Sequence, residues 1–454
     1  MNIHFIAIGG AIMHQLALAL HHKGNKITGS DDEINDPAKT NLKNAGILPE
    51  AYGWYPEKIT STIDAIVLGM HAKANNPELL KAQELKIPVY SFPEYVYKVS
   101  EEKKRVVVAG SHGKTTITSM IMHILKAAHQ DFDYLVGAKV AGFAQSVQLS
   151  DAPTIVLEGD EYPASAIEKK PKIFFYHPQI SVLSGIAWDH INVFPTYDNY
   201  CSQFEYYLET MQAGALLFYN ATDSEVVRIV TKSGKHLKAI PYVMPHYHYV
   251  NGEANITTDV GDFKLSLFGN HNLLNMEAAI AVCEALGINR KAGYTAISSF
   301  TGAAKRLEKI FEQDHLVAYR DFAHAPSKLK ATLDAVREAY PNHRLIACFE
   351  LHTYSSLSDA FLKEYKHSMS AADEALVYFS HHALSLKGLP ALHSSTVAEN
   401  FDQKNLIVID EKSTLETYIS NTLKDTSKPV CLLLMSSGTF DEINWKDVCT
   451  LQTN

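Results

Sequence analysis

The chain has 454 residues, of which 46% are hydrophobic and 20% are charged, and its formal net charge is −9. This length predicts two or three domains, and the composition is typical of a globular protein with a sizeable core. The acidic balance, the lack of a long Lys/Arg block and the lack of any apolar run near the roughly 20 residues of a membrane span exclude nucleic acid and membrane from the expected partners.

Cysteine usage and the amino-terminal segment indicate the compartment. The first 24 residues are apolar, but they have no basic start and are interrupted by Gly9-Gly10, so they predict a strand, a turn and a helix and not a signal peptide. We therefore expect a cytoplasmic protein, and no obligate protein partner is evident. The cysteines are scattered without a CxxC pair, as is usual for free thiols in a reducing compartment: Cys201, Cys283, Cys348, Cys431 and Cys449.

The first hundred residues alternate short β-branched runs with helical patterns, which predicts a parallel sheet with crossover helices. The first turn, "IAIGGAIMH" at residues 6–14, resembles a dinucleotide-binding fingerprint. The glycines of G-x-G-x-x-G would fall on Ala7, Gly9 and Ile12, so support for NAD is weak. Gly9-Gly10 still allows a pyrophosphate to approach the backbone at the start of the helix.

The stretch "VVVAGSHGKTTITSM" at residues 106–120 predicts a phosphate-binding loop. A glycine-rich turn between a buried strand and a helix directs backbone N–H groups at one point, where the helix dipole also favours an anion. Lys114 adds a positive charge, and the hydroxyl of Thr115 could hold Mg²⁺. The standard pattern GxxxxGK[ST] wants a glycine where Val108 stands. An ordinary turn is the alternative, but a lysine in a first helical turn is unfavourable without an anion.

Two further strand ends carry candidate metal ligands. "TIVLEGDEY" ends in Glu158, Asp160 and Glu161, and "ISVLSGIAWDH" ends in Asp189 and His190. In open α/β sheets, ligands bind outside the carboxyl ends of the strands, so at least one of these acids is expected to reach a magnesium ion. Alone, such residues are more often a solvated loop and a packing histidine.

The remaining chain predicts more α/β structure. The charge run at residues 101–105 predicts a solvated linker, and residues 213–268 predict a β-rich insertion with hairpin turns at NG and GD. Residues 270–288 have the apolar spacing of a helix. A third block of alternating strands and helices begins after residue 306, which gives three α/β domains in all.

Four segments in chain order resemble motifs of the ATP-dependent Mur ligases, which attach amino acids or peptides to UDP-N-acetylmuramic acid. "GSHGKTT" looks like their GTxGKTT loop, and "FGNHNLLNMEAAIAV" resembles their G-x-HN-xxN-xxAAxA segment. "KRLE" followed by "RDFAHAPS" is similar to their RR-[FL]-[ED] and DD-[YF]-[AG]-HHP[ST] motifs. The resemblance covers essentially the whole chain.

The resemblance implies a three-domain α/β architecture. A Rossmann-like N-terminal domain, residues 1–102, would bind the UDP-sugar. A central P-loop ATPase-like domain, residues 103–303, would bind ATP, and a Rossmann-like C-terminal domain, residues 304–454, would bind the amino substrate. It also implies an ADP-forming ligase of cell-wall biogenesis with ATP and Mg²⁺ as cofactors.

Site residues follow from the resemblance by position. Lys114 would contact the γ-phosphate, and Thr115, Glu158 and His190 would hold magnesium. Further catalytic candidates are His324 and His352. ATP would be bound by Gly110, Ser111, His112, Gly113, Lys114, Thr115, Thr116, Asn272, Asn275, Arg306 and Asp321. The UDP-sugar would be bound by Gly9, Gly10, Ala11, Ser30 and Asp31.

Two departures from the family pattern bear on this site. Some members carry a carbamoylated lysine after the metal histidine, but no lysine occurs here from Ile191 to Thr231. The resemblance to the muramate-adding branch then implies that His190 completes the second metal site. Ala325 stands where the family has the second histidine of its HH pair, which leaves His324 as the candidate.

The acceptor could be one of two amines. "IHFIAIGGAIMH" resembles the branch that takes UDP-N-acetylmuramate itself, in which one member adds L-alanine and another adds the tripeptide L-Ala-γ-D-Glu-meso-diaminopimelate. "LEGDEY", "WDHINVF" and "MSSGTFDEI" favour the tripeptide, as used in peptidoglycan recycling. His352 in "FELHTYSSL" is reminiscent of the alanine-adding motif, though without its arginines. An ATP-driven switch protein and a dinucleotide oxidoreductase are the alternatives from other classes.

Overall fold

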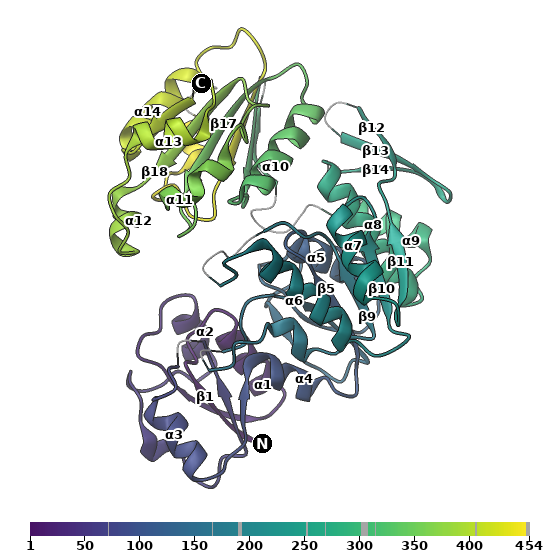
Figure 1. Ribbon diagram of the computed structural model, residues 1–454, viewed down its shortest axis with the longest axis vertical. Coiled ribbons are helices and arrows are strands. Elements are labelled where there is room, and N and C mark those ends of the chain that lie inside the picture. Colours follow the sequence, from purple (N-terminus) through teal and green to yellow (C-terminus); the bar gives the residue numbers. More distant parts are fainter. Residues whose placement is uncertain are drawn as a thin grey trace. The chain divides into compact units, whose positions relative to one another are not determined.

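The computed structural model describes residues 1–70, 72–165, 167–188, 193–250, 253–267, 269–300, 307–313, 315–404 and 406–450 (Figure 1). These residues form two compact units. The first comprises residues 1–188, 195–243 and 276–296, and the second includes residues 244–275 and 297–450. Each unit is α/β, as the alternating pattern predicts.

The N-terminal part of the first unit is a parallel sheet in the order β2-β1-β3-β4. Its strands are β1 (Asn2–Ile6), β2 (Lys26–Ser30), β3 (Ala65–Leu68) and β4 (Val89–Ser91). The connecting helices are α1 (Met13–His22), α2 (Ala38–Asn44), η1 (Pro56–Lys58), α3 (Pro77–Glu84) and α4 (Phe92–Val99). The order changes direction at β1, so the turn that follows β1 lies at the crevice where such sheets bind ligands.

The rest of the first unit is built on a seven-stranded sheet in the order β11-β10-β9-β5-β8-β6-β7, which is parallel except at β7. Its strands are β5 (Lys104–Ala109), β6 (Asp133–Leu135), β7 (Val147–Gln148), β8 (Thr154–Glu158), β9 (Ile180–Leu183), β10 (Leu216–Asn220) and β11 (Lys238–Tyr242). Its helices include α5 (Lys114–Ala127), η2 (Lys172–Phe175), α6 (Tyr197–Thr210) and α7 (Ser224–Ser233). Because β5 lies between β8 and β9, its carboxyl end has a neighbouring strand end on either side.

Residues 101–105, the charge run predicted to be a solvated linker, are exposed only in part. Strand β5 already begins at Lys104, and the side chain of Arg105 is buried. Its guanidinium donates hydrogen bonds to the carbonyl oxygens of Ser100, Tyr176 and His177, at 2.7, 2.8 and 3.2 Å. A buried guanidinium persists here because its donors are matched by carbonyl acceptors.

The β-rich insertion forms an antiparallel three-stranded sheet, β12-β13-β14, from β12 (His246–Val250), β13 (Glu253–Thr258) and β14 (Gly261–Leu265). The NG of the first predicted hairpin turn, residues 251–252, lies outside the described residues. The GD prediction is wrong, because Gly261 and Asp262 already pair with Thr258 and Thr257 inside β14. The two-residue turn is Asp259-Val260 instead.

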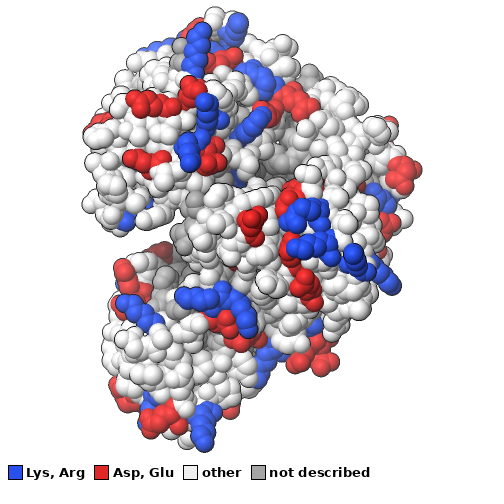
Figure 2. Space-filling view, viewed as in Figure 1, with Lys and Arg blue, Asp and Glu red and all other residues white. Residues whose placement is uncertain are grey.

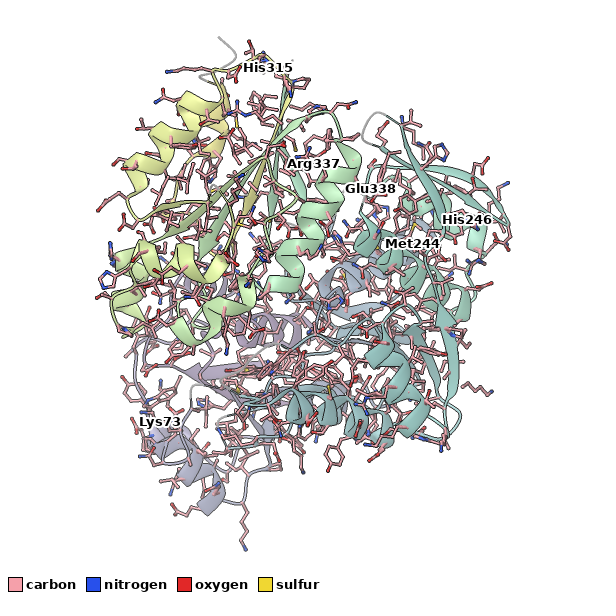
Figure 3. The ribbon with its side chains drawn as sticks, turned by 45° about the horizontal axis from the view of Figure 1, so that its top comes forward. Lys73, Met244, His246, His315, Arg337 and Glu338 are labelled. Atoms are coloured by element: carbon pink, nitrogen blue, oxygen red, sulfur yellow. The ribbon has the colours of Figure 1, made fainter. Side chains whose placement is uncertain are left out.

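Helices α8 (Asn270–Ala285) and α9 (Arg290–Ile297) follow the hairpin sheet. The hydroxyl of Tyr247 on β12 donates to Asn270 Oδ1 at 2.6 Å and to Glu338 Oε1 at 2.7 Å. Figure 3 labels Glu338 on its helix and His246 on β12. The small sheet is thus hydrogen-bonded through Tyr247 to helix α10 (Pro326–Ala339), which carries Glu338.

The C-terminal sheet has the order β15-β16-β20-β17-β18-β19, and all of its pairs except β15–β16 are parallel. The strands are β15 (Glu308–Gln313), β16 (Leu316–Asp321), β17 (Arg344–Leu351), β18 (Glu374–Phe379), β19 (Leu406–Ile409) and β20 (Val430–Met435). The helices are α10 (Pro326–Ala339), α11 (Asp359–Leu362), η3 (Lys363–Tyr365), α12 (His381–Leu386), α13 (Ser394–Phe401), α14 (Lys412–Thr422) and α15 (Trp445–Thr450). The carboxyl ends of β16, β17 and β20 therefore share one edge.

On the face seen in Figure 2, basic and acidic side chains are interspersed and form no broad patch of one sign. Ion pairs among the described residues include those of Arg228 and Lys232 with Glu205, at 3.2 and 2.7 Å. Among the described residues, no helix has the length and apolar character to cross a membrane.

Replacing Arg105 tests the energetic role of its buried guanidinium. We expect Arg105→Met to lower the free energy of unfolding by about 3 kcal/mol, because several buried carbonyl oxygens would lose their donor. Denaturant unfolding followed by tryptophan fluorescence measures this loss. Lys104→Met, at the exposed neighbouring position, is the control. Equal stability of the two variants would contradict the assigned role.

Candidate active site

The predicted phosphate loop connects β5 to α5 in a conformation that requires glycine. Gly110 has φ = 125° and Gly113, at the start of α5, has φ = 79°. A Cβ on Gly110 would lie 2.3 Å from Ser184 Oγ and 3.0 Å from the backbone nitrogen of Gly185. The chain thus leaves the strand through a turn that no other residue fits, and it enters a 14-residue helix at Lys114.

The loop is fixed by the segment that follows β9, a contact that no sequence pattern predicts. The backbone nitrogen of Ser111 donates to Gly185 O at 2.9 Å, and Ser111 Oγ accepts from the nitrogen of Ala187 at 2.8 Å. Ser184 Oγ donates to the carbonyl oxygen of His112. These bonds hold the loop between two strand ends, and only the small residues of "LSGIA" hinted at so close an approach.

Lys114 is held within a carboxylate cluster. Its ammonium donates to Gly110 O at 2.6 Å and to Glu161 Oε2 at 2.7 Å. Burial by itself would lower the pKa of Lys114, but the charges of Glu161, Asp160 and Glu158 outweigh it, and the net pKa is raised. The lysine is therefore a permanent cation at neutral pH.

Thr115 and Glu158 are brought together as predicted. Thr115 Oγ1 donates to Glu158 Oε1 at 2.6 Å, and Glu158 Oε2 accepts from the backbone nitrogen of Gly137 at 2.6 Å. A Cβ on Gly137 would lie 3.1 Å from Glu158 Oε2, so a small residue is needed there. A hydroxyl and a carboxylate oxygen side by side are the donors that Mg²⁺ prefers, and the pair therefore fits this ion.

The other two acids of the strand end have separate partners. Asp160 accepts a hydrogen bond from Lys172 Nζ at 2.7 Å. Burial by itself would raise the pKa of Asp160, but Lys172 and Lys114 lower it below the usual value. Glu161 accepts from Tyr200 OH at 2.9 Å, in addition to Lys114. Tyr200, on α6, is a site residue that was not predicted from the sequence, because nothing in "NYCSQF" distinguishes it.

Two predicted site residues, His190 and Arg306, lie outside the described residues, so the second metal ligand set stays a prediction. Within the described part of the chain, no group of three or more His, Cys, Asp and Glu side chains is placed to hold a metal. The Thr115–Glu158 pair therefore supplies only part of a coordination shell.

The predicted UDP-sugar residues lie at the carboxyl ends of β1 and β2. The backbone nitrogen of Gly9 donates to Asp31 Oδ2 at 2.7 Å, and a Cβ on Gly9 would lie 2.9 Å from that oxygen. Burial raises the pKa of Asp31, and neighbouring Asp32 adds to this rise. Ser30 Oγ is buried and has no hydrogen-bond partner among the described residues. Ala11 is exposed beside Gly10.

The end of β16 carries Asp321, and His324 follows it. The carboxylate of Asp321 already accepts bonds from the backbone nitrogens of Leu307 and Ala323, at 2.7 and 2.9 Å, and from Thr332 Oγ1 at 3.1 Å. His324 Nδ1 bonds Phe322 O at 3.0 Å. Asp321 thus ties Leu307, just before β15, to the start of the segment that follows β16 and to α10. Asn272 and Asn275 lie nearly buried on α8.

His352 follows the end of β17 next to a buried acid. Its Nδ1 lies 3.6 Å from Glu350 Oε1, and the other oxygen of Glu350 accepts from the nitrogen of Phe440 at 2.9 Å. A Cβ on Gly438 would lie 2.6 Å from His352 Nδ1. Because β16 and β17 both pair with β20, His352 and Asp321 lie at the same edge of the C-terminal sheet.

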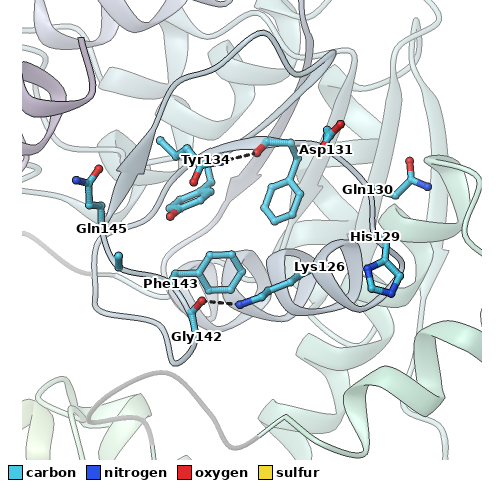
Figure 4. A pocket seen from close by; sticks show the side chains of 11 residues that line it. Lys126, His129, Gln130, Asp131, Tyr134, Gly142, Phe143 and Gln145 are labelled. Atoms are coloured by element: carbon cyan, nitrogen blue, oxygen red, sulfur yellow. Dashed lines mark hydrogen bonds between the residues drawn. The ribbon is translucent and has the colours of Figure 1, made fainter. Parts of the chain in front are cut away.

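A separate cavity of about 520 Å³ lies beside the last turn of α5, and Figure 4 shows residues that line it. The rings of Phe132, Tyr134 and Phe143 line it, and Lys126 Nζ donates to Gly142 O at 2.6 Å across it. Lys126 is in the last turn of α5, whereas Lys114 begins the helix. The cavity is thus not part of the phosphate site.

The Thr115 hydroxyl can be removed without changing the shape of the side chain. We expect Thr115→Val to weaken magnesium-dependent nucleotide binding by about tenfold or more, because one of two paired oxygen donors is lost. Calorimetric titration measures this affinity. Thr118→Val on the same helix is a matched control, because Thr118 Oγ1 is buried without a hydrogen-bond partner among the described residues. Equal affinities of both variants would refute the metal role of Thr115.

Comparison with known proteins identifies the family of the chain. Residues 2–104 match the family described as Mur ligase family, catalytic domain, residues 108–283 match the Mur ligase middle domain, and residues 305–438 match the Mur ligase, glutamate ligase domain. The UDP-N-acetylmuramate–L-alanine ligase of Agathobacter rectalis is 32% identical over 389 residues, which are 82% of each chain.

Two solved structures have the same fold over the whole chain. One is a UDP-N-acetylmuramate-alanine ligase from Thermotoga maritima, with a TM-score of 0.71 and 21% identity, and covers 100% of this chain and 99% of its own. The other is a murein peptide ligase from Psychrobacter arcticus, with a TM-score of 0.64 and 22% identity and the same coverage. With its N-terminal, middle and C-terminal domains in order, the chain belongs to the Mur ligase family of ATP-dependent, ADP-forming amide ligases.

Proposed function

We propose that this ligase uses ATP and Mg²⁺ to join the lactyl carboxylate of UDP-N-acetylmuramate to an amine. The observation that carries the proposal is the phosphate loop, where Lys114 and Thr115 begin α5 and Thr115 contacts Glu158 at the end of β8. The donor substrate rests on the relatives, since the two L-alanine ligases named above act on UDP-N-acetylmuramate by their names. The boundaries at residues 102 and 303 belong to the same proposal.

The residue types suit this chemistry. A carboxylate is a poor acylating agent, so ATP first converts it to an acyl phosphate, and the amine then expels phosphate through a tetrahedral intermediate. Lys114, a permanent cation, would neutralise charge on the transferred phosphoryl group. Thr115 and Glu158 would hold magnesium, which supplies electrostatic stabilisation of the phosphates. Gly9 and Gly10 would admit the diphosphate of the UDP-sugar close to the backbone.

L-Alanine is the acceptor that the relatives favour. The bacterial relative that is 32% identical is named as an L-alanine ligase, and so is the Carboxydothermus hydrogenoformans protein, which is 27% identical over 98% of this chain. We therefore propose L-alanine as the first candidate. The tripeptide, which the sequence motifs favoured, is the second.

A specific observation keeps the tripeptide as a candidate. The segment after His352 reads Thr353, Tyr354, Ser355 and Ser356, without an arginine that could pair with the carboxylate of a free amino acid. Tyr354 is 56% exposed. An open, uncharged segment suits a longer acceptor better than a small zwitterion.

Removing the loop lysine tests the proposed ATP site. We expect Lys114→Ala to reduce ADP release that depends on UDP-N-acetylmuramate and amine by at least about 10²-fold, because the charge of the transferred phosphoryl group loses its cation. A coupled ADP assay measures the rate. Lys126→Ala, in the last turn of the same helix, should retain normal turnover. Near-normal turnover of Lys114→Ala, or ADP release that ignores both substrates, would contradict the ligase assignment.

A side-by-side assay identifies the acceptor. With saturating ATP and UDP-N-acetylmuramate, the kcat/KM for L-alanine should be at least about tenfold higher than that for the tripeptide. A site that binds one acceptor productively discriminates against the other acceptor by about this factor. Mass spectrometry of the products confirms which amide forms. A preference of the same size for the tripeptide would instead establish the second candidate and reject the first.

A further inference from the structure

The carboxylate of Glu161 is the nearest described acid to the phosphate-binding lysine. Its Oε2 lies 2.7 Å from Lys114 Nζ, and the two side chains are 1% and 14% exposed. Tyr200 OH donates to the other oxygen of Glu161 at 2.9 Å, and Tyr200 is fully buried. The carboxylate is thus held from a second helix and cannot turn away freely from the ammonium.

Among the described residues, the charged side chains around the loop carry a net negative charge. The described cluster has two ammonium groups, Lys114 and Lys172, against three carboxylates, Glu158, Asp160 and Glu161, so its sum is 2 − 3 = −1. The lysine that would attract a phosphate is already neutralised by a buried partner. A buried ion pair is costly to break when one partner would be left without its counter-charge.

We propose that Glu161 is a positioning residue that makes nucleotide binding depend on the divalent metal. The pairing with Lys114 removes the loop's attraction for a metal-free nucleoside triphosphate, and it holds the ammonium in place. A divalent cation near Thr115 and Glu158 would reverse the sign of the cluster from −1 to +1, so only the metal-bound triphosphate is attracted. This inference rests on the proposed ATP site.

Making nucleotide binding depend on the metal would benefit the reaction. ATP without its metal could occupy the loop but could not be activated for phosphoryl transfer, because the charge on its oxygens would stay unscreened. Excluding this form keeps the site from being blocked by an unreactive ligand. A purely structural role of the ion pair predicts something different, namely that breaking it weakens binding of both nucleotide forms.

Isothermal titration of the full chain with ATP, in magnesium and in EDTA, separates these possibilities. We expect the native chain to bind ATP in magnesium and to have an affinity for ATP at least about tenfold lower in EDTA. Glu161→Gln keeps the size of the side chain and an acceptor for Tyr200 but frees Lys114. We expect this variant to bind metal-free ATP at least about tenfold more tightly than the native chain does, and a gain of binding does not arise from damage to the fold.

Asp160→Asn is the matched control, because it changes the charge of the cluster by the same amount but leaves the Lys114–Glu161 pair intact. Its gain in affinity for ATP in EDTA, relative to the native chain, should be clearly smaller than that of Glu161→Gln. Equal gains would overturn the proposal in favour of overall charge alone. Glu161→Asp, which retains the charge but shortens the side chain, should fall between native and Glu161→Gln, and it serves as the test if the glutamine variant does not fold.

The outcomes distinguish the inference from the function on which it rests. If the native chain binds ATP in magnesium and Glu161→Gln shows no gain in EDTA, the role of Glu161 is wrong while the ATP site stands. If no form of the chain binds ATP in either condition, the ATP site itself is wrong, and the inference falls with it.

Discussion

The candidate site depends on the position of β5 between β8 and β9. This order brings Glu158 to one side of the phosphate loop and Gly185 to the other. Neither the hydroxyl of Thr115 nor the loop backbone could make these contacts if the strands were ordered as they occur in the sequence. The parallel arrangement then leaves the strand ends, the loop and the start of α5 at one edge, where an anion and a cation can be bound together.

Much of the fold and part of the site can be predicted from the sequence, because they rest on local patterns. Alternating apolar runs gave the parallel sheets, and Gly110, Gly113 and Lys114 marked the loop. The rule that parallel strand ends share an edge predicted that an acid after β8 would lie near the loop, and the resemblance to the Mur ligases pointed to Glu158 with Thr115. What the sequence could not supply depends on long-range contacts. Tyr200 reaches Glu161 from a helix about forty residues away, and its segment has no distinguishing pattern.

The two errors in the fold have similar causes. Arg105 belongs to a charged run, and only the carbonyl oxygens of Tyr176 and His177, distant in sequence, turn it into a buried residue. Gly261-Asp262 has turn chemistry, but the register of β13 with β14 places both residues in the strand. The choice between L-alanine and the tripeptide is a third question that local patterns do not answer, because the quoted motifs favour the tripeptide whereas the names of the relatives favour L-alanine.

The central claim is that Thr115 and Glu158 hold the metal that accompanies the triphosphate at Lys114. A crystal structure with Mn²⁺ and a non-hydrolysable ATP analogue tests it most directly, because manganese gives an anomalous signal at its own position. The account predicts an anomalous peak about 2.0–2.3 Å from Thr115 Oγ1 and from a Glu158 oxygen, with a γ-phosphate oxygen within hydrogen-bond distance of Lys114 Nζ. A nucleotide bound in the loop with its metal away from both residues would contradict it.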